Sequence, residues 1–340
     1  MSLFERDRSA ERTPVSLVTG FLGSGKTTLL NRLLADKRMQ RSLVLVNEFG
    51  EVGLDHLLME SVSGDMVLLQ SGCVCCTIKG ELEQTLRGIA ARRQDGAMPA
   101  FDRVLIETTG IADPGPILQL LLNWPTVSHD FRLDAVLCTV DALHGGRQLD
   151  EHPEALRQAA VADRLLITKS DLADAALCGA LDERLALVNP GAPRFPAVNG
   201  EIDPAELFGA APSSASPAAA LQRWLGVTRH DDRHTHHHDG TQIASFTLEF
   251  DAPLDWDLFA GWLAGVRAVW GDHLLRVKGI LNVAGEHAPL VIHGVHRTFH
   301  SPTLLARWPE GERRSRVVFI TRGLARVEVE ASWRDYLSSR

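Results

Sequence analysis

The stretch GFLGSGKT, Gly20–Thr27, stands between an apolar run at 15–19 and a helix-like stretch at 26–37. It fits the pattern G-x-x-x-x-G-K-[ST], in the strand–loop–helix context that this pattern requires. Glycines let successive backbone N–H groups point at a phosphate, and the following helix N-terminus adds positive potential. The stretch therefore predicts a phosphate-binding loop. Its expected phosphate ligands are Gly20, Gly23, Ser24, Gly25, Lys26 and Thr27.

Two side chains of this loop have predicted chemical roles. Lys26 is expected to reach the β- and γ-phosphates, and the Thr27 hydroxyl to ligate Mg²⁺. In the helix-like stretch that follows, leucines mark one face, which predicts that this face is buried. They are Leu29, Leu30, Leu33 and Leu34.

Apolar runs alternate with helix-like stretches from the phosphate loop to about residue 200. Several runs are continuously apolar, as in strands that are buried on both faces. The alternation predicts an α/β fold of the P-loop NTPase type, a doubly wound and mostly parallel sheet wrapped by helices. The expected strands are 15–19, 42–46, 66–69, 103–107, 135–140, 164–168 and 194–198.

The composition changes after residue 208. Residues 209–241 contain a small, Pro- and Ser-rich stretch, followed by a His-rich one. Alternation resumes at 243–250, and an amphipathic helix is expected at 255–270. We therefore predict three parts: a P-loop domain at 14–208, a linker at 209–241 and a smaller α+β domain at 242–338.

Composition excludes several classes of protein. Of 340 residues, 45% are hydrophobic and 23% charged, which indicates a globular chain. Because the net charge is −8, we do not expect the overall charge of the chain to attract nucleic acid. No run of eighteen apolar residues occurs, and the N-terminus is charged, so we expect no membrane partner and a cytoplasmic location. Five cysteines are too few for a disulfide scaffold.

The stretch TKSD, 168–171, follows an apolar run and matches the guanine-selecting element, which is usually Asn-Lys-x-Asp. The carboxylate of Asp171 can accept both N–H groups of the guanine edge, whereas adenine would leave that charge unpaired. The stem of Lys169 can lie over the base. Thr168 replaces the usual Asn, so one supporting contact must be weakened or rerouted. The alternative is a solvated turn.

The stretch IETTG, 106–110, resembles the D-x-x-G element of GTPases, with Glu107 in place of Asp. Glu107 is expected to hold Mg²⁺, and Gly110 to offer its N–H to the γ-phosphate. Ile111 stands where a water-positioning Gln would be, which predicts slow intrinsic hydrolysis. The stretch NEFGEVGLD, 47–55, is expected to be a first switch loop, or else a charged surface loop.

Three of the five cysteines, Cys73, Cys75 and Cys76, fall within four positions. Three thiolates this close suit Zn²⁺ or another borderline-soft metal and leave one tetrahedral position free. The fourth ligand could be Glu51, His56, a water or a partner's residue. A redox dithiol and buried inert cysteines are the alternatives. Cys138 and Cys178 are expected to be structural.

Five of the fourteen histidines lie in the polar stretch 230–238. Their irregular spacing favours a weak, auxiliary site that collects metal ions, and a merely solvated loop is the alternative. They are His230, His234, His236, His237 and His238.

Taken in order, GFLGSGKTT, NEFGEVGLD, GCVCC, IETTGIADPGP and TKSD resemble the CobW family of P-loop GTPases, within the CobW/HypB/UreG group. HLLRVKGIL and RVVFITRGL resemble the CobW C-terminal domain, and IETTGIADPGPI looks close to the YjiA-like branch. The resemblance covers nearly the whole chain. It implies that Thr28 joins the phosphate loop residues, that Lys169 and Asp171 bind guanine, and that the three clustered cysteines bind metal.

The resemblance further implies a GTP-dependent metallochaperone or insertase that delivers Zn²⁺, Co²⁺ or a similar ion to a client metalloprotein. Its branches serve cobalamin synthesis, nitrile hydratase and zinc homeostasis, and the motifs do not separate them. The expected partners are GTP or GDP, the metal ion and the client, with a homodimer left open. The alternatives are a nucleotide-independent metal buffer and a P-loop ATPase or kinase with a redox-active CxCC.

Overall fold

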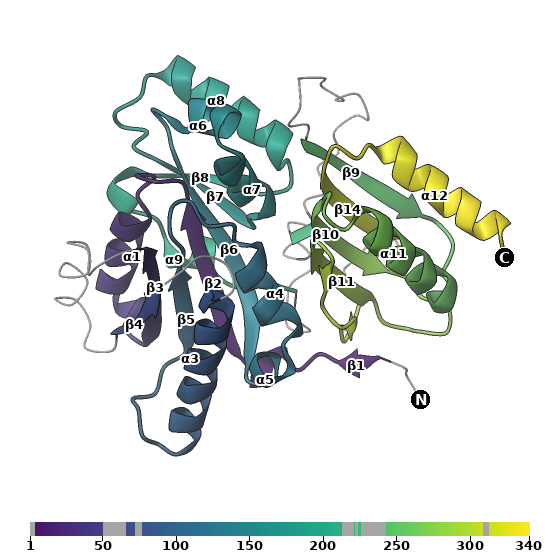
Figure 1. Cartoon of the computed structure of the whole chain (residues 1–340), viewed down its shortest axis with the longest axis horizontal. Coiled ribbons are helices and arrows are strands. Elements are labelled where there is room, and N and C mark those ends of the chain that lie inside the picture. Colours follow the sequence, from purple (N-terminus) through teal and green to yellow (C-terminus); the bar gives the residue numbers. More distant parts are fainter. Residues whose placement is uncertain are drawn as a thin grey trace. The chain divides into compact units, whose positions relative to one another are not determined.

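The structure is a computed structural model that describes residues 4–49, 66–71, 77–212, 221, 224–225, 243–308 and 313–340 (Figure 1). Residues 1–8, 185–192 and 212–340 form one compact unit, and residues 9–184 and 193–211 form the other. The predicted domain boundaries stay a prediction, since most of 209–241 lies outside the described residues. Some site residues predicted from the sequence also lie outside them. These are Glu51, Cys73, Cys75, Cys76, His230, His234, His236, His237 and His238.

The second of these units is built on a seven-stranded sheet in which every described pairing is parallel. All seven predicted strands are present, in the spatial order β4-β3-β5-β2-β6-β7-β8. Their bounds are β2 Thr13–Gly20, β3 Ser42–Phe49, β4 Met66–Ser71, β5 Arg103–Glu107, β6 Phe131–Asp141, β7 Arg164–Thr168 and β8 Arg194–Ala197. The predicted α/β fold class is therefore confirmed.

One predicted loop begins differently. Strand β3 continues three residues past the expected end at 46, so Asn47–Phe49 of the predicted switch loop at 47–55 belong to a strand. The pairing of β3 with β4 extends the strand beyond its apolar residues, whereas its pairing with β5 ends at Val46. Residues 50–55 lie outside the described ones.

Helices alternate with these strands (Figure 1). The first, α1 (Lys26–Ala35), buries the four leucines predicted for its inner face, and they pack against Val18 and Leu105 of the sheet. Helices α4 and α7 contact β6. The other helices of this unit are α3 Thr77–Gln94, α4 Gly115–Asn123, α5 Pro125–Ser128, α6 Gly145–Glu151, α7 Pro153–Val161, α8 Ala175–Val188 and α9 Pro204–Leu207.

The sheet topology positions the loops that matter for function. Strand β2 is central, and the chain builds the sheet outward to β3 and β4 on one side and to β7 and β8 on the other. In open α/β sheets, ligands bind at such a switch point, beyond the carboxyl ends of the strands. Because the strands are parallel, the loops after β2, β5, β6 and β7 leave from the same edge.

The other unit holds a second seven-stranded sheet, ordered β1-β13-β11-β10-β14-β9, with β12 paired to β11. Its pairings are antiparallel except for that of β1 with β13, so the predicted α+β class is confirmed. The elements are β9 Ile243–Phe250, α11 Trp256–Trp270, β10 Leu274–Leu281, β11 Leu290–Val295, β12 Thr298–Phe299, β13 Thr303–Leu304, β14 Ser315–Arg322 and α12 Arg326–Ser338.

Strand β1, Glu5–Arg6, was not expected from the sequence. It pairs in parallel with Thr303 and Leu304, so the first residues of the chain belong to the sheet built from the last third. A two-residue strand is too short to show the alternation by which strands are recognised.

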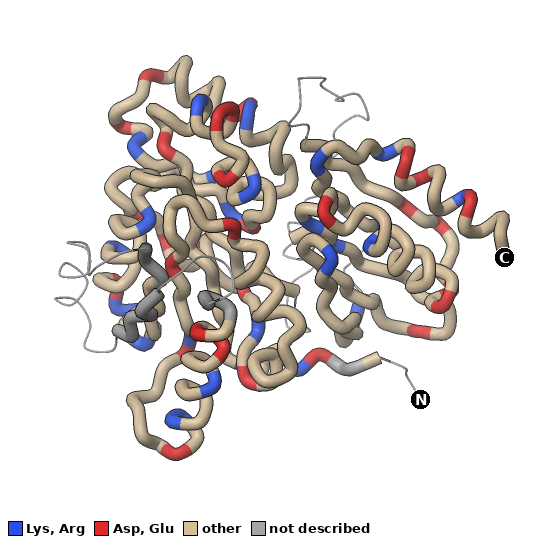
Figure 2. Tube along the Cα trace, viewed as in Figure 1, with Lys and Arg blue, Asp and Glu red and all other residues tan. Residues whose placement is uncertain are grey.

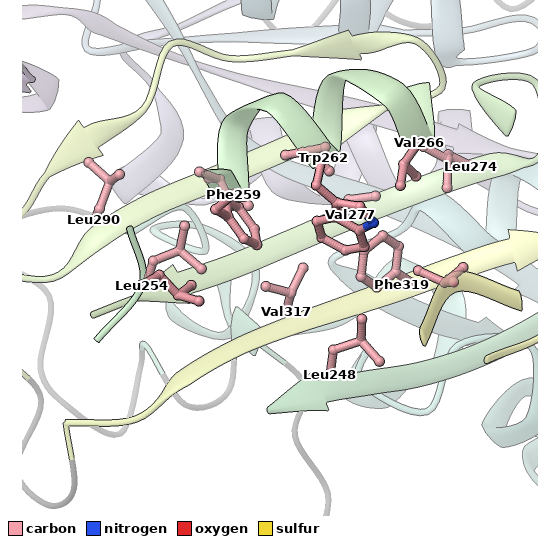
Figure 3. Close-up of a cluster of buried hydrophobic side chains, with 14 of the residues drawn as sticks. Leu248, Leu254, Phe259, Trp262, Val266, Leu274, Val277, Leu290, Val317 and Phe319 are labelled. Carbon is pink, nitrogen blue, oxygen red and sulfur yellow. The ribbon is translucent and has the colours of Figure 1, made fainter. Parts of the chain in front are cut away.

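The core of this unit lies between its sheet and α11 (Figure 3). Phe259 and Trp262 of the helix pack on Phe319 of β14 and on Leu248 of β9. Asp255 accepts a hydrogen bond from the backbone N–H of Leu258 at 3.0 Å and so caps the helix at its first turn. The predicted helix at 255–270 is thereby confirmed to within one residue.

Charged positions of both signs are interspersed along the described parts of both units (Figure 2). Among the described residues, no helix is long and apolar enough to cross a membrane.

Candidate nucleotide-binding site

The phosphate loop leaves the carboxyl end of the central strand and runs directly into α1. Gly20 has a φ of 141°, which L side chains rarely adopt, and a Cβ there would clash with the hydroxyl and carbonyl oxygens of Thr139. Ser24 Oγ and Thr139 Oγ1 are 2.7 Å apart and hydrogen-bonded. The loop therefore lies directly against the end of β6, which only a glycine at position 20 permits.

Lys26 is folded back over its own loop. Its Nζ donates to the carbonyl oxygens of Gly20 at 3.1 Å and Phe21 at 3.3 Å, and the residue is only 8% exposed. An ammonium held over the loop in this way can add a full positive charge where nucleotide phosphates would lie.

Thr27 and Glu107, the two residues predicted to ligate Mg²⁺, are in contact beside the phosphate loop. Thr27 Oγ1 donates to Glu107 Oε1 at 3.1 Å, and Glu107 is 6% exposed. Glu107 ends β5 and is paired in register with Val18 of β2, which places its carboxylate beside the phosphate loop. A hydroxyl and a carboxylate are hard oxygen donors of the kind that hold Mg²⁺ in P-loop enzymes, so these residues fit that ion.

The loop after β5 touches the phosphate loop at Gly110. A Cβ on Gly110 would lie 2.7 Å from the backbone nitrogen of Leu22 and 2.8 Å from its Cα, so only glycine fits this approach. Behind it, Thr108 Oγ1 donates to Thr19 Oγ1 at 3.0 Å. The next residue, Ile111, is 50% exposed and carries no group that could orient a water.

The TKSD element is joined to the phosphate loop by the residue that departs from the usual pattern. Thr168 Oγ1 donates to Ser24 O at 2.8 Å, so the threonine hydroxyl links the two loops. Lys169 has a left-handed φ of 55°, and its Nζ donates to Asp141 Oδ2 at 2.7 Å. Asp171 is exposed.

Two site residues escaped the sequence analysis. Thr139 contacts the phosphate loop, and the buried Asp141 holds Lys169 while accepting from the backbone N–H of Leu143 at 2.8 Å. Both are polar residues at the end of the apolar run 135–140. Their position could have identified them as candidate site residues, because ligands bind beyond the carboxyl ends of buried parallel strands.

The cysteine cluster lies outside the described residues, but the elements on either side of it are described. Strand β4 ends at Ser71, in register with Phe49 of β3, and α3 begins at Thr77. Strand β4 therefore ends at the same edge of the sheet as β2, from which the phosphate loop leaves. Within the described parts of the chain, no group of three or more His, Cys, Asp or Glu could hold a metal ion.

The two cysteines expected to be structural are described. Cys138 is buried in β6, and burial raises the pKa of its thiol to about 12. A thiol with that pKa stays protonated at neutral pH and is a poor metal ligand. Cys178 lies on α8 and is half-buried.

Two family models match the chain. Residues 14–196 match the model of the CobW/HypB/UreG nucleotide-binding domain. Residues 243–337 match the model of the cobalamin synthesis protein CobW C-terminal domain.

Individual relatives match over nearly their whole length. The chain is 34% identical over 319 residues to the zinc chaperone YjiA of Escherichia coli (strain K12), covering 94% of this chain and 97% of the relative. It is 30% identical over 342 residues to the zinc chaperone CobW of a Sinorhizobium species, covering 91% and 92%. The crystal structure of the Zn(II)-bound YjiA GTPase from E. coli superimposes with a TM-score of 0.71 at 28% identity, covering 96% of this chain and 99% of that one.

Proposed function

The chain belongs to the CobW/HypB/UreG family, and from this premise we propose that it is a GTPase that carries a transition-metal ion on its CxCC segment and delivers it to a client metalloprotein. The observation that carries the proposal is the shared sheet edge. The phosphate loop, the Thr27–Glu107 pair and the TKSD element lie there, and β4, which directly precedes the segment with Cys73, Cys75 and Cys76 in the sequence, ends there. Nucleotide and metal binding would thus be linked through segments that follow neighbouring strands of one sheet.

GTP is the proposed nucleotide because of how TKSD is held. Thr168 ties the element to the phosphate loop, and Asp141 holds Lys169. Asp171, which follows two residues later, is exposed and available to a base. A carboxylate in that place accepts two N–H groups from guanine and would be left unpaired by adenine.

The proposed metal ligands are Cys73, Cys75 and Cys76, with Glu51 as the fourth. Thiolates select borderline-soft ions, and the relatives named zinc chaperones support Zn²⁺ as the cargo, with Co²⁺ as a second candidate. The His230–His238 stretch would collect ions weakly before transfer. Mg²⁺ is assigned to Thr27 and Glu107, where it would neutralise phosphate charge.

In the proposed mechanism, the binding of GTP and the binding of the metal ion are coupled because GTP orders the loops. GTP would present its γ-phosphate to the N–H of Gly110, with Lys26 reaching the β- and γ-phosphates and Glu107 holding Mg²⁺. Ordering of the loops at this edge would bring the three thiolates and a carboxylate into metal-binding geometry. Hydrolysis removes the γ-phosphate and so loosens the metal site for transfer.

Metal affinity is the direct test of this coupling. We expect Zn²⁺ to bind at least about tenfold more tightly with Mg²⁺ and a non-hydrolysable GTP analogue than without nucleotide, and the analogue to gain the same factor from Zn²⁺. Competition against a chromogenic chelator under reducing conditions measures the first factor, and fluorescence titration of a labelled analogue the second. Equal Zn²⁺ affinity in both states would refute the coupling.

The same titration tests the ligands. Replacing Cys73, Cys75 and Cys76 together by alanine should abolish tight Zn²⁺ binding, whereas Cys178→Ser, which removes a half-buried thiol on α8, should leave it intact. Tight binding by the triple variant would refute the site. A metal buffer would bind through the cysteines with no nucleotide dependence, an ATPase or kinase would respond to an ATP analogue, and a redox protein would form a reversible disulfide instead.

Intrinsic GTP hydrolysis by the purified protein should be slow. Ile111 cannot orient an attacking water, so we expect a turnover below about 0.01 s⁻¹, the range of GTPases that lack an activating partner. Phosphate release under single-turnover conditions measures this rate. Turnover of about 1 s⁻¹ or faster would mean that another group of this chain positions the water.

A further inference from the structure

The loop after β5 is held from behind by α7. Gln158 is fully buried, and its Nε2 donates both to Gly110 O at 3.1 Å and to Ala112 O at 3.0 Å. The neighbouring Arg157 reaches Asp113 with 3.3 Å between Nε and Oδ2. On its other side, Gly110 lies against the backbone of Leu22 in the phosphate loop. The loop is therefore clamped between the phosphate loop and one turn of α7.

The amide of Gln158 is poorly explained by stability alone. Its nitrogen must face the loop, because an amide oxygen there would meet two carbonyl oxygens. Its own oxygen, Oε1, is buried and has no hydrogen-bond partner among the described residues. A buried acceptor without a donor destabilises the fold, so the amide leaves its own oxygen unbonded while it bonds two carbonyl oxygens of the loop. What the glutamine does achieve is to fix the carbonyl of Gly110.

We propose that Gln158 is a positioning residue for GTP, which holds the Gly110 peptide so that the N–H of Gly110 meets the γ-phosphate. Glycine constrains its own φ and ψ less than any other residue, so its N–H needs such an external restraint. Helix α7 thereby distinguishes GTP from GDP, because only GTP has the phosphate that this N–H contacts. The inference rests on the proposed function and deepens it at the same site.

The comparison of GDP with GTP tests this role. Gln158→Met keeps the length of the side chain and removes the donor. We expect it to weaken binding of a Mg²⁺–GTP analogue, and to lower kcat, by about tenfold or more, while GDP affinity stays within about twofold. Gln148→Met on α6 is the matched control, since Gln148 lines the same small cavity as Gln158 and should leave both affinities unchanged. Unchanged GTP affinity in Gln158→Met, or an equal loss for GDP and GTP, would overturn the proposal.

Gln158→Glu adds a second measurement, the pH dependence of kcat, which would not change if Gln158 were purely structural. At neutral pH its carboxylate would face two carbonyl oxygens without a proton to share. Burial raises the pKa of such a carboxyl, and below that pKa the neutral acid can donate one hydrogen bond to the loop. The ratio of variant to wild-type kcat should therefore rise as the pH falls from 8 to 6, and a flat ratio would contradict the proposal. Failure of the wild-type protein to bind GTP at all would instead refute the proposed function itself.

Discussion

Replacing Lys26 by methionine is expected to lower kcat/KM for GTP by about 100- to 1000-fold, the usual loss when one preorganised donor to a developing charge is removed. The ammonium group lies over the phosphate loop, held by the carbonyl oxygens of Gly20 and Phe21, in a site that is 8% exposed. Because Lys26 is mostly shielded from water, its charge would act on the phosphate oxygens of a bound nucleotide with little screening. Methionine keeps the length and apolar stem of the side chain and removes only that charge.

Steady-state GTP hydrolysis and binding of a labelled GTP analogue measure the two parts of this loss. The matched control is Lys37→Met, which removes an exposed lysine from the short 3₁₀ turn after α1 and should leave kcat/KM within about twofold. A Lys26→Met variant with more than a tenth of the wild-type kcat/KM would show that the phosphates are held elsewhere. Circular dichroism should be unchanged, because methionine keeps the length and apolar stem of Lys26 at the start of α1.

An element could be predicted from the sequence where the pattern that identifies it lies within its own residues. All seven strands of the nucleotide-binding sheet follow apolar runs, several of them continuous, and α1 follows the spacing of its leucines. Strand β1 could not be predicted, because its two residues are defined only by pairing with Thr303 and Leu304, about 300 positions away in the sequence. The extension of β3 through Phe49 likewise follows from its pairing with the neighbouring strand β4.

In the candidate site too, the residues of local motifs could be predicted, whereas those brought in by contacts between loops could not. The phosphate loop, Glu107 and TKSD were found because each is a short motif with its chemistry in adjacent residues. Contacts between loops depend on which strands are neighbours and in what register. Gly20 is aligned with Thr139, and Asp141 with Thr168, and these alignments bring Thr139 and Asp141 into the site. Gln158 was missed because α7 meets the loop after β5 only in the folded chain.

Replacing Asp171 by asparagine is expected to change the base that the protein prefers from guanine to xanthine. The carboxylate would accept from both N1–H and the 2-amino group of guanine, whereas asparagine presents one acceptor and one donor, and its NH₂ would face the 2-amino group. Xanthine carries an oxygen at that position and so pairs with asparagine. We expect GTP affinity to fall by about 100-fold, or about 2.7 kcal/mol, and XTP to bind more tightly than GTP.

Competition of GTP, XTP and ATP against a labelled nucleotide measures this exchange. The control is Asp174→Asn three residues on, where Oδ1 of Asp174 accepts from the backbone N–H of Leu177 at 2.8 Å. Asparagine caps a helix as well as aspartate does, so this variant loses the same charge without losing the cap, and its GTP preference should be unchanged. If Asp171→Asn still prefers GTP to XTP, residue 171 does not read the base. The TKSD stretch is then a solvated turn, held to the phosphate loop by Thr168 for structural reasons alone.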